Sequence, residues 1–324
     1  MVRILSDGDV AQLLAVDDLL GVVEEAFVKQ GRGEGERPDR PHYPVGTGLD
    51  GDEPLGMGLT MPAYVHGQET FATKLVGVHE GNAERGLPTV NAQVVVTDAR
   101  TGQPLAFMHG NRITNARTGC IGGLAVRELA RAPVDLGVFG AGTQARWQTR
   151  AVAAATDLER VRVYSPSDSR RECASDLRAE LDVDARAVDA PEAVLDGADA
   201  IVAATTSATP VFPGSALEPG QLVVGVGSFN AEMQELDAET FARAARVFAD
   251  VPEEVAGIGD LLATDLRASD LIPLSEVFEG RAGREADDEI LVVDSVGTAV
   301  LDAATAEYLH GRATGADAGT TVEF

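Results

Sequence analysis

The sequence has almost no lysine. Lys29 and Lys74 are the two lysines among 324 residues, and arginine supplies the other basic side chains. Acidic residues outnumber basic residues by 52 to 26, which gives a formal net charge of −26. Binding to nucleic acid needs basic patches, so this balance argues against a nucleic-acid partner. The acidic residues are scattered, which predicts a folded protein with an acidic surface. The acidic surface and the scarcity of lysine favour a halophilic source, because concentrated salt screens the repulsion between acidic side chains.

Cysteine is also scarce, and long apolar runs are missing. The two cysteines, Cys120 and Cys173, lie far apart, and the five histidines form no metal-binding pattern, so no metal site is expected. No apolar run approaches the roughly 20 residues that span a bilayer. The N-terminus lacks the order of a signal peptide. We therefore expect a soluble cytoplasmic protein without a membrane partner.

The length of 324 residues favours two domains. Ser6-x-x-Asp9 resembles a capping box, and apolar residues at helical spacing follow it up to Phe27. Residues 58–106 contain short apolar runs separated by turn signals, which is typical of strands. This first part is predicted to be an α+β domain with a largely antiparallel sheet.

The pattern of predicted secondary structure changes after residue 114. One helical stretch is followed by short apolar strands that alternate with helical segments, beginning with "VDLGVFG" and "RVRVYS". Alternation of this kind predicts a parallel sheet covered by helices on both faces. The chain then shows a strand-like run at 290–294, a turn at Gly297 and a final helix.

A glycine-rich turn lies at the start of this second part. Gly140-x-Gly142-x-x-Ala145 follows a predicted strand directly and precedes a predicted helix, with Thr143 and Gln144 inside the motif. Glycine permits the tight turn and lets backbone N–H groups approach a pyrophosphate at the helix N-terminus. In this context the motif predicts a dinucleotide site.

The end of the second strand bears on the choice between NAD and NADP. An acidic residue there would bind the ribose hydroxyl of NAD, but Ser165 occupies the position, with Arg170 and Arg171 close behind. Serine and arginine suit a 2′-phosphate better, so NADP is favoured over NAD. Asp168 leaves NAD open as the alternative, and the arginines could be ordinary surface charges.

Several segments together resemble the ornithine cyclodeaminase/mu-crystallin family, and the resemblance runs almost end to end. The segments are "MPAY" (61–64), "TKLV" (73–76), "GLPTV" (86–90), "TDARTGQPLAFMHG" (97–110), "ITNARTG" (113–119), "GAGTQA" (140–145), "AATTS" (203–207), "ELD" (235–237) and "DSVGTAVLDAA" (294–304). The resemblance implies an α/β protein with a central Rossmann-type doubly wound parallel sheet, expected over 119–305. It also implies an α+β substrate and dimerisation domain built from both chain ends, expected over 1–118 and 306–324, and a homodimer.

The resemblance also implies site residues. Lys74 matches the family's active-site lysine, Arg117 matches a ligand of the substrate carboxylate, and Arg40 is a second carboxylate ligand. An arginine fork can bind a carboxylate in bidentate fashion, and a lysine in a dry pocket has a lowered pKa and can exchange a proton. The remaining expected cofactor residues are Thr118, Thr205, Gly227 and, together with Ser295, Gly297. The alternatives are a snorkelling surface lysine at 74 and a helix-end salt bridge at 117.

Two positions depart from the family's pattern. Aligned on "ELD", Phe229 stands where cyclodeaminases carry a catalytic aspartate, and Glu232 or Glu235 could replace it only if the loop rearranged. His109 stands where relatives have aspartate, and we expect a surface or supporting role for it.

The leading hypothesis is therefore an enzyme, an NAD(P)-dependent oxidoreductase acting on the C=N or C–N bond of a small α-imino or α-amino acid. Cyclic ketimines such as pyrroline-2-carboxylate are the first candidates, and alanine, or pyruvate with ammonia, is the second. One alternative is an ornithine cyclodeaminase that uses NAD catalytically. Another is a non-catalytic protein that binds NADP and a small ligand.

Overall fold

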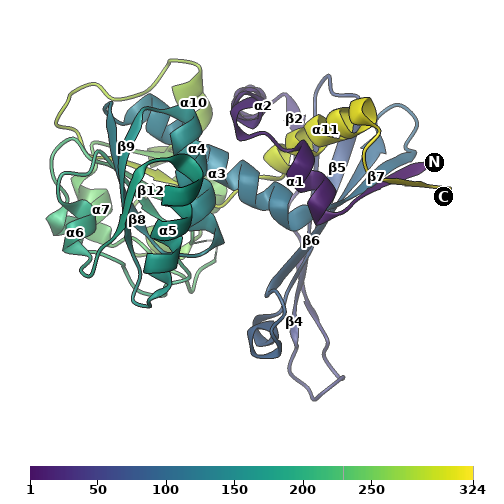
Figure 1. Cartoon of the computed structure of the whole chain (residues 1–324), viewed down its shortest axis with the longest axis horizontal. Coiled ribbons are helices and arrows are strands. Elements are labelled where there is room, and N and C mark those ends of the chain that lie inside the picture. The colour runs from purple at the N-terminus through teal and green to yellow at the C-terminus, as the bar shows by residue number, and fades with distance from the viewer. Residues whose placement is uncertain (229, 324) are drawn as a thin grey trace. The chain divides into compact units, whose positions relative to one another are not determined.

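The computed structural model describes residues 1–228 and 230–323, and the chain divides into two compact units (Figure 1). Unit 1 comprises Met1–Ala15, Arg32–Arg117 and Thr298–Phe324. Unit 2 comprises Val16–Gly31 and Thr118–Gly297. Unit 2 is thus inserted into unit 1, which takes segments from both ends of the sequence.

Unit 1 contains a largely antiparallel sheet. Its strands are β1 (Val2–Leu5), β2 (Gly35–Glu36), β3 (His42–Val45), β4 (Gly56–Val65), β5 (Thr70–Val78), β6 (Val90–Asp98), β7 (Pro104–His109) and β16 (Thr320–Val322). They are ordered β16-β1-β7-β6-β5-β4-β2, with β3 paired to β4, and β1 and β7 form the one parallel pair among these strands of the described chain. The antiparallel sheet predicted for this part is confirmed.

Alternation of buried residues explains why one face of this sheet is covered. On β6, Ala92, Val94 and Val96 are buried, whereas Gln93 is exposed and Val95 is partly exposed, which is the two-residue period of a strand. Helix α11 (Ala299–Ala316) contacts β4, β5 and β6, and Figure 1 shows it lying along the sheet. Helix α1 (Asp7–Leu13) begins with the capping box predicted at Ser6. A short helical turn, η1 (Glu80–Arg85), joins β5 to β6.

Unit 2 contains a parallel sheet. Its strands are β8 (Val134–Phe139), β9 (Leu158–Tyr164), β10 (Asp184–Ala187), β11 (Ala200–Ala203), β12 (Leu222–Gly225), β13 (Arg246–Ala249), β14 (Ile272–Pro273) and β15 (Leu291–Asp294). Their order is β10-β9-β8-β11-β12-β15-β13-β14, so the chain leaves β8 first in one direction and then in the other. This reversal is the feature of a doubly wound sheet, and the predicted fold class is confirmed.

Helices cover both faces of the parallel sheet (Figure 1). The helices that lie wholly or partly in unit 2 are α2 (Val16–Gly31), α3 (Gly110–Leu129), α4 (Thr143–Ala155), α5 (Ser169–Leu181), α6 (Glu192–Leu195), α7 (Ala238–Arg243), α8 (Pro252–Val255), α9 (Gly259–Leu262) and α10 (Leu274–Phe278), with short turns η2 (Gly214–Ala216) and η3 (Ala268–Asp270). Every residue of β11, β12 and β15 is buried, which explains why these strands are continuous apolar runs in the sequence.

The observed boundaries differ from the expected ranges, which were 1–118 with 306–324 for one domain and 119–305 for the other. Unit 1 resumes at Thr298 and not at residue 306, because 299–305 are the first turns of the continuous helix α11. Helix α2 belongs to unit 2 because it packs against α10 and α4, with Phe27 and Phe278 in ring contact at 5.3 Å. The other boundary falls inside α3, between Arg117 and Thr118.

Candidate functional site

Lys74 lies on the covered face of the unit 1 sheet. On β5, Thr70, Ala72 and Lys74 are the buried residues, and they alternate with residues that are partly exposed. The side chain of Lys74 is 3% exposed. The alternative of a snorkelling surface lysine is therefore wrong, and the lysine is enclosed within unit 1.

A buried carboxylate, Asp302, joins Lys74 to Arg117. Lys74 Nζ lies 2.7 Å from Asp302 Oδ2, and Arg117 Nε donates to Asp302 Oδ1 at 3.1 Å. Lys74 Nζ also donates to Thr114 Oγ1 at 3.3 Å. Because β5, α3 and α11 each contribute a residue, the fold of unit 1 assembles this group from three distant parts of the sequence.

The proton affinities follow from this burial and charge. The pKa of Lys74 is lowered to about 8, mainly by burial and in addition by the charges of Arg117 and Arg40, although Asp302 opposes this shift. Burial alone would raise the pKa of Asp302, but Arg117 and Lys74 outweigh it, and the pKa lies below its ordinary value. Lys74 can therefore lose and regain a proton near neutral pH, while Asp302 stays ionised.

Arg117 keeps one donor unused. Its Nη1 atom is buried and has no hydrogen-bond partner among the described residues. Arg40 is half-buried and close enough for its charge to act on Lys74. The structure thus brings together the three substrate residues predicted from the sequence. An unsatisfied guanidinium donor beside two other cationic side chains suits a carboxylate ligand.

Sequence reasoning missed Asp302. The residue lies within "DSVGTAVLDAA", a segment whose resemblance to the family implies no role for the aspartate. One signal was available, because Asp302 is the single charged residue in an otherwise apolar and small-residue helical segment from 296 to 306. A buried charge is expected to have a charged partner, and Lys74 was the candidate.

The glycine-rich turn of unit 2 has open space at the helix N-terminus. Gly140 has φ +105°, and a Cβ there would lie 2.4 Å from Ala204 O, so this position requires glycine. Gly142 is the N-cap of α4 without a side-chain cap, and a Cβ there would meet no atom within 4 Å. The first N–H groups of a helix have no partner within the helix, and open space beside such an N-terminus fits a pyrophosphate. Ala145 is buried where helix and strand meet.

Three serine hydroxyls gather after β9. Ser165 Oγ lies 3.2 Å from Ser167 Oγ and 3.4 Å from Ser169 Oγ, and the last two lie 2.6 Å apart. Arg170 donates to Ser167 O at 2.7 Å and to Asp189 Oδ1 at 2.9 Å. Arg170 therefore helps to fix the conformation of this loop. The three hydroxyls form one polar cluster, and the sequence prediction included only Ser165 from it.

Loops at the carboxyl ends of other unit 2 strands contain the remaining expected cofactor residues. Thr205 and Gly227 follow β11 and β12, and Gly297 follows β15 with φ +76°. Asp250 accepts hydrogen bonds from Gly297 N at 2.7 Å and from Ser295 Oγ at 2.7 Å. At Thr118, the carbonyl accepts from Gln148 at 2.9 Å, which joins α3 to α4.

The positions that depart from the family pattern have separate roles. His109 Nδ1 lies 3.4 Å from Asp7 Oδ1 with a side chain 42% exposed, so it is a surface residue as expected. Glu235 is fully buried and both of its carboxylate oxygens accept backbone N–H groups, while Glu232 is exposed. Glu235 therefore does not have the free carboxylate that a catalytic base needs. Phe229 lies outside the described residues.

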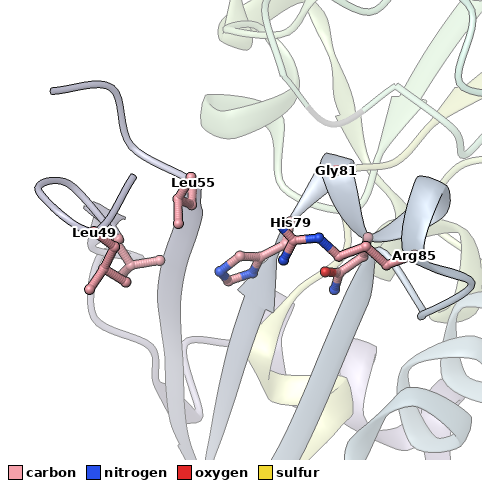
Figure 2. A pocket seen from close by; sticks show the side chains of 8 residues that line it. Leu49, Leu55, His79, Gly81 and Arg85 are labelled. Atoms are coloured by element: carbon pink, nitrogen blue, oxygen red, sulfur yellow. The ribbon is translucent and has the colours of Figure 1, made fainter. Parts of the chain in front are cut away.

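A separate pocket lies in unit 1, away from these residues (Figure 2). Figure 2 shows the His79 ring between the leucine side chains and Arg85. The lining residues are Val45, Gly46, Leu49, Leu55, His79, Gly81, Asn82 and Arg85. None of them is an expected site residue.

Within the described residues, no cluster of histidine, cysteine or acidic side chains is arranged to hold a metal ion. The same part of the chain has no helix long and apolar enough to cross a membrane.

Comparison with known proteins gives matches along almost the whole chain. Residues 2–317 match the profile of the ornithine cyclodeaminase/mu-crystallin family. A Delta(1)-pyrroline-2-carboxylate reductase of Bacillus cereus is 34% identical over 299 residues, covering 88% of this chain and 90% of the relative. The structure of Thermococcus litoralis Delta(1)-pyrroline-2-carboxylate reductase in complex with NADH and L-proline superposes with a TM-score of 0.92 at 31% identity, covering 99% of this chain and 100% of that one. An archaeal alanine dehydrogenase dimer with bound NAD gives a TM-score of 0.90 at 28% identity, covering 100% and 99%.

Proposed function

Because the chain belongs to the ornithine cyclodeaminase/mu-crystallin family, we propose that it is an NAD(P)-dependent oxidoreductase for the C=N or C–N bond of a small α-imino or α-amino acid. The first substrate class is a five- or six-membered cyclic ketimine with a carboxylate on the imine carbon, such as pyrroline-2-carboxylate. Pyruvate with ammonia, or alanine in the reverse direction, is the second. The similarity to reductases and an alanine dehydrogenase supports this reaction class.

The single observation that carries the proposal is the buried Lys74 beside Asp302 and an unused donor of Arg117. In the proposal, Arg117 and Arg40 bind the substrate carboxylate, and Lys74 donates a proton to the substrate nitrogen during reduction. Asp302 keeps Lys74 and Arg117 in place. Arginine could not replace Lys74 in this role, because a guanidinium does not release its proton near neutral pH.

Unit 2 carries the proposed cofactor site. When bound, the dinucleotide supplies the hydride that reduces the imine carbon. Gly140, Gly142, Thr143, Gln144 and Ala145 form the turn that would hold the pyrophosphate, and the open N-terminus of α4 supports this assignment. The proposed cofactor residues beyond this turn are Thr118, Ser165, Arg170, Thr205, Gly227 and Gly297.

NADP is the preferred cofactor in this proposal, with NAD as the alternative. The end of β9 carries Ser165, Ser167 and Ser169 within hydrogen-bond distance of one another, and no carboxylate stands at the Ser165 position. Three hydroxyls and the N-terminus of α5 are suitable donors for a phosphate. Similar structures with NADH or NAD establish the broader class of nicotinamide cofactor for relatives.

A homodimer is part of the proposal. The alanine dehydrogenase that this chain resembles is a dimer. In unit 1, strand β3, the β3–β4 loop, the start of β4 and the segment at the start of β6 expose large apolar side chains, and Figure 1 shows these strand ends extending beyond α1 and α11. The exposed residues are Tyr43, Leu49, Leu55, Met57, Leu87 and Val90. Patches of this kind favour association with a protein surface, and light scattering in solution tests the dimer.

The assay that tests the function follows nicotinamide absorbance in concentrated KCl. NADPH and NADH are each offered with pyrroline-2-carboxylate, and then with pyruvate plus ammonia. We expect oxidation of NADPH with the cyclic imine, and Lys74→Ala should lower turnover by at least about a hundredfold, the lower range for a positioned acid. Binding of the cofactor should change little in that variant.

Other outcomes would support a different function. Ammonia release from ornithine with catalytic NAD would support the cyclodeaminase alternative, against which the phenylalanine at 229 argues. Cofactor binding without turnover of any substrate would support the non-catalytic alternative. Full activity of Lys74→Ala would contradict the role given to Lys74.

A further inference from the structure

We propose that Glu235 is a positioning residue of the dinucleotide site, and that its ionised carboxylate holds the loops after β11 and β12 in the form that binds the cofactor. The inference rests on the proposed function, since Thr205 and Gly227 are cofactor residues only in that proposal. It adds a pH dependence of cofactor binding that comes from a residue outside the proposed contacts.

Glu235 joins the ends of two neighbouring strands. It lies in the loop between β12 and α7, and its side chain is 0% exposed. Glu235 Oε1 accepts from Thr205 N at 2.5 Å, and Oε2 accepts from Gly227 N at 2.7 Å. One carboxylate therefore fixes both loops, since β11 and β12 are adjacent in the parallel sheet.

The packing around these contacts is tight. A Cβ on Gly227 would lie 2.2 Å from Thr205 O and 2.6 Å from Glu235 Oε2. The position therefore has no room for a side chain, and the two loops and the carboxylate contact one another directly. Protonation or substitution of the Glu235 carboxylate therefore has to move at least one of the loops.

Glu235 itself is held from behind by a second buried acid. Asp260 Oδ1 accepts from the backbone N–H of Glu235 at 2.6 Å and from that of Leu236 at 2.8 Å. Asp260 is 0% exposed. Asp260 therefore fixes the backbone from which the buried Glu235 side chain reaches the two loops.

The ionised form of Glu235 is the one that these contacts require. Both oxygens face N–H donors, so a proton on either oxygen would point at another donor and remove one hydrogen bond. The pKa of Glu235 is raised to about 7, mainly by burial and in addition by the nearby Asp260, although the hydrogen bonds from Thr205 and Gly227 oppose this shift. Asp294, buried at the end of β15, is another acidic group whose charge interacts with Glu235.

The expected result is weaker cofactor binding in mild acid. If only the ionised form binds, apparent affinity falls with the ionised fraction, by about tenfold between about pH 8 and about pH 6. Calorimetric titration with NAD⁺ measures this directly. NAD⁺ is the probe because the 2′-phosphate of NADP⁺ titrates near pH 6 itself.

Glu235→Gln is the diagnostic variant, and Glu232→Gln is its matched control. Glutamine keeps the shape but offers one oxygen and a permanent NH₂ donor, so Glu235→Gln should bind NAD⁺ weakly and with little pH dependence. Glu232 is exposed in the same loop, so its variant should follow the wild type. If Glu235→Gln only loosened the structure, its affinity for NAD⁺ would fall, but the pH dependence seen in the wild type would remain.

The outcomes separate this inference from the proposed function. A wild-type protein that binds neither NAD⁺ nor NADP⁺ at any pH would contradict the proposed function. Binding with the same pH profile in wild type and Glu235→Gln would overturn the role of Glu235 alone. If Glu235→Gln does not fold, the wild-type amide resonances of Thr205 and Gly227 decide. They should titrate together near neutral pH, and amides that do not titrate would overturn the inference.

Discussion

At the scale of single residues, the charge of Asp302 affects the pH at which Lys74 loses its proton. The pKa of Lys74 is about 8, because burial lowers it while Asp302 opposes this shift. If Lys74 is the proton donor in reduction, activity should fall as the pH rises through the pKa. In Asp302→Asn, that fall should begin at a lower pH, because the charge that favours the protonated lysine is gone.

The measurement is the pH profile of kcat/KM for imine reduction by wild type and Asp302→Asn. The variant leaves Lys74 and Arg117 buried without a charged partner, which should lower stability by about 3–5 kcal/mol. Thermal melting in the same buffer therefore accompanies the assay. A folded variant with an unshifted profile would contradict this assignment.

The same residues show what could be predicted from sequence. Lys74 and Arg117 were found because their types suit the chemistry and because their segments resemble a family. Asp302 and Glu235 were not given their roles. Their partners, at 74 and 117 and at 205 and 227, come together only through tertiary packing, and a local pattern contains no information on such contacts. The hydroxyl cluster after β9 was predicted in part, because the sequence pattern indicates Ser165 and Arg170 as cofactor residues.

At the scale of elements, the turn between β8 and α4 contains two glycines with different requirements. Gly140→Ala should destabilise the protein by about 1–3 kcal/mol, because φ is +105° there and the new Cβ would collide with Ala204 O. Gly142→Ala should change stability by less than about 0.5 kcal/mol, because φ is −85° and the space is open.

Cofactor binding should respond to the second change as well. The Cβ of Gly142→Ala would occupy the space proposed for the pyrophosphate, so affinity for NAD(P) should fall while the melting temperature stays nearly constant. Melting curves and calorimetry on the two variants separate these effects. Normal affinity in Gly142→Ala would place the pyrophosphate elsewhere.

Element boundaries in the sequence were clearer than domain boundaries. The alternating strands and helices after residue 134 were predicted because each apolar run is short and bounded by turn residues. The division within α11 was misplaced, and α2 was assigned to the wrong unit. Helical periodicity shows that a helix has an apolar face, but it does not identify the sheet or helix that covers this face.

At the scale of the whole molecule, the net charge of −26 predicts a dependence on salt. Acidic side chains that repel one another destabilise the folded state, and salt screens this repulsion. The free energy of unfolding should therefore rise as KCl is raised from about 0.1 M to about 2 M, where the Debye length falls from about 10 Å to below about 3 Å. Denaturant titration by urea, which is uncharged, measures it.

A charge-reduced variant serves as the control for this prediction. Neutralising the exposed Glu159, Asp196 and Glu239 as Gln, Asn and Gln changes the formal charge from −26 to −23. Its stability should depend less steeply on KCl than that of the wild type. Equal stability of the wild type at both salt concentrations would argue against a halophilic protein.

The insertion of unit 2 into unit 1 has a consequence for folding during synthesis. A ribosome makes the chain from its N-terminus, so all of unit 2 is available before residues 298–324 are made. Until then β1 lacks β16, and β4, β5 and β6 lack the helix that covers them. Lys74 and Arg117 are made early, but their shared carboxylate at Asp302 emerges among the last segments of the unit. Lys74 and Arg117 therefore lack this carboxylate until α11 docks, and the proposed catalytic group of unit 1 is completed only then.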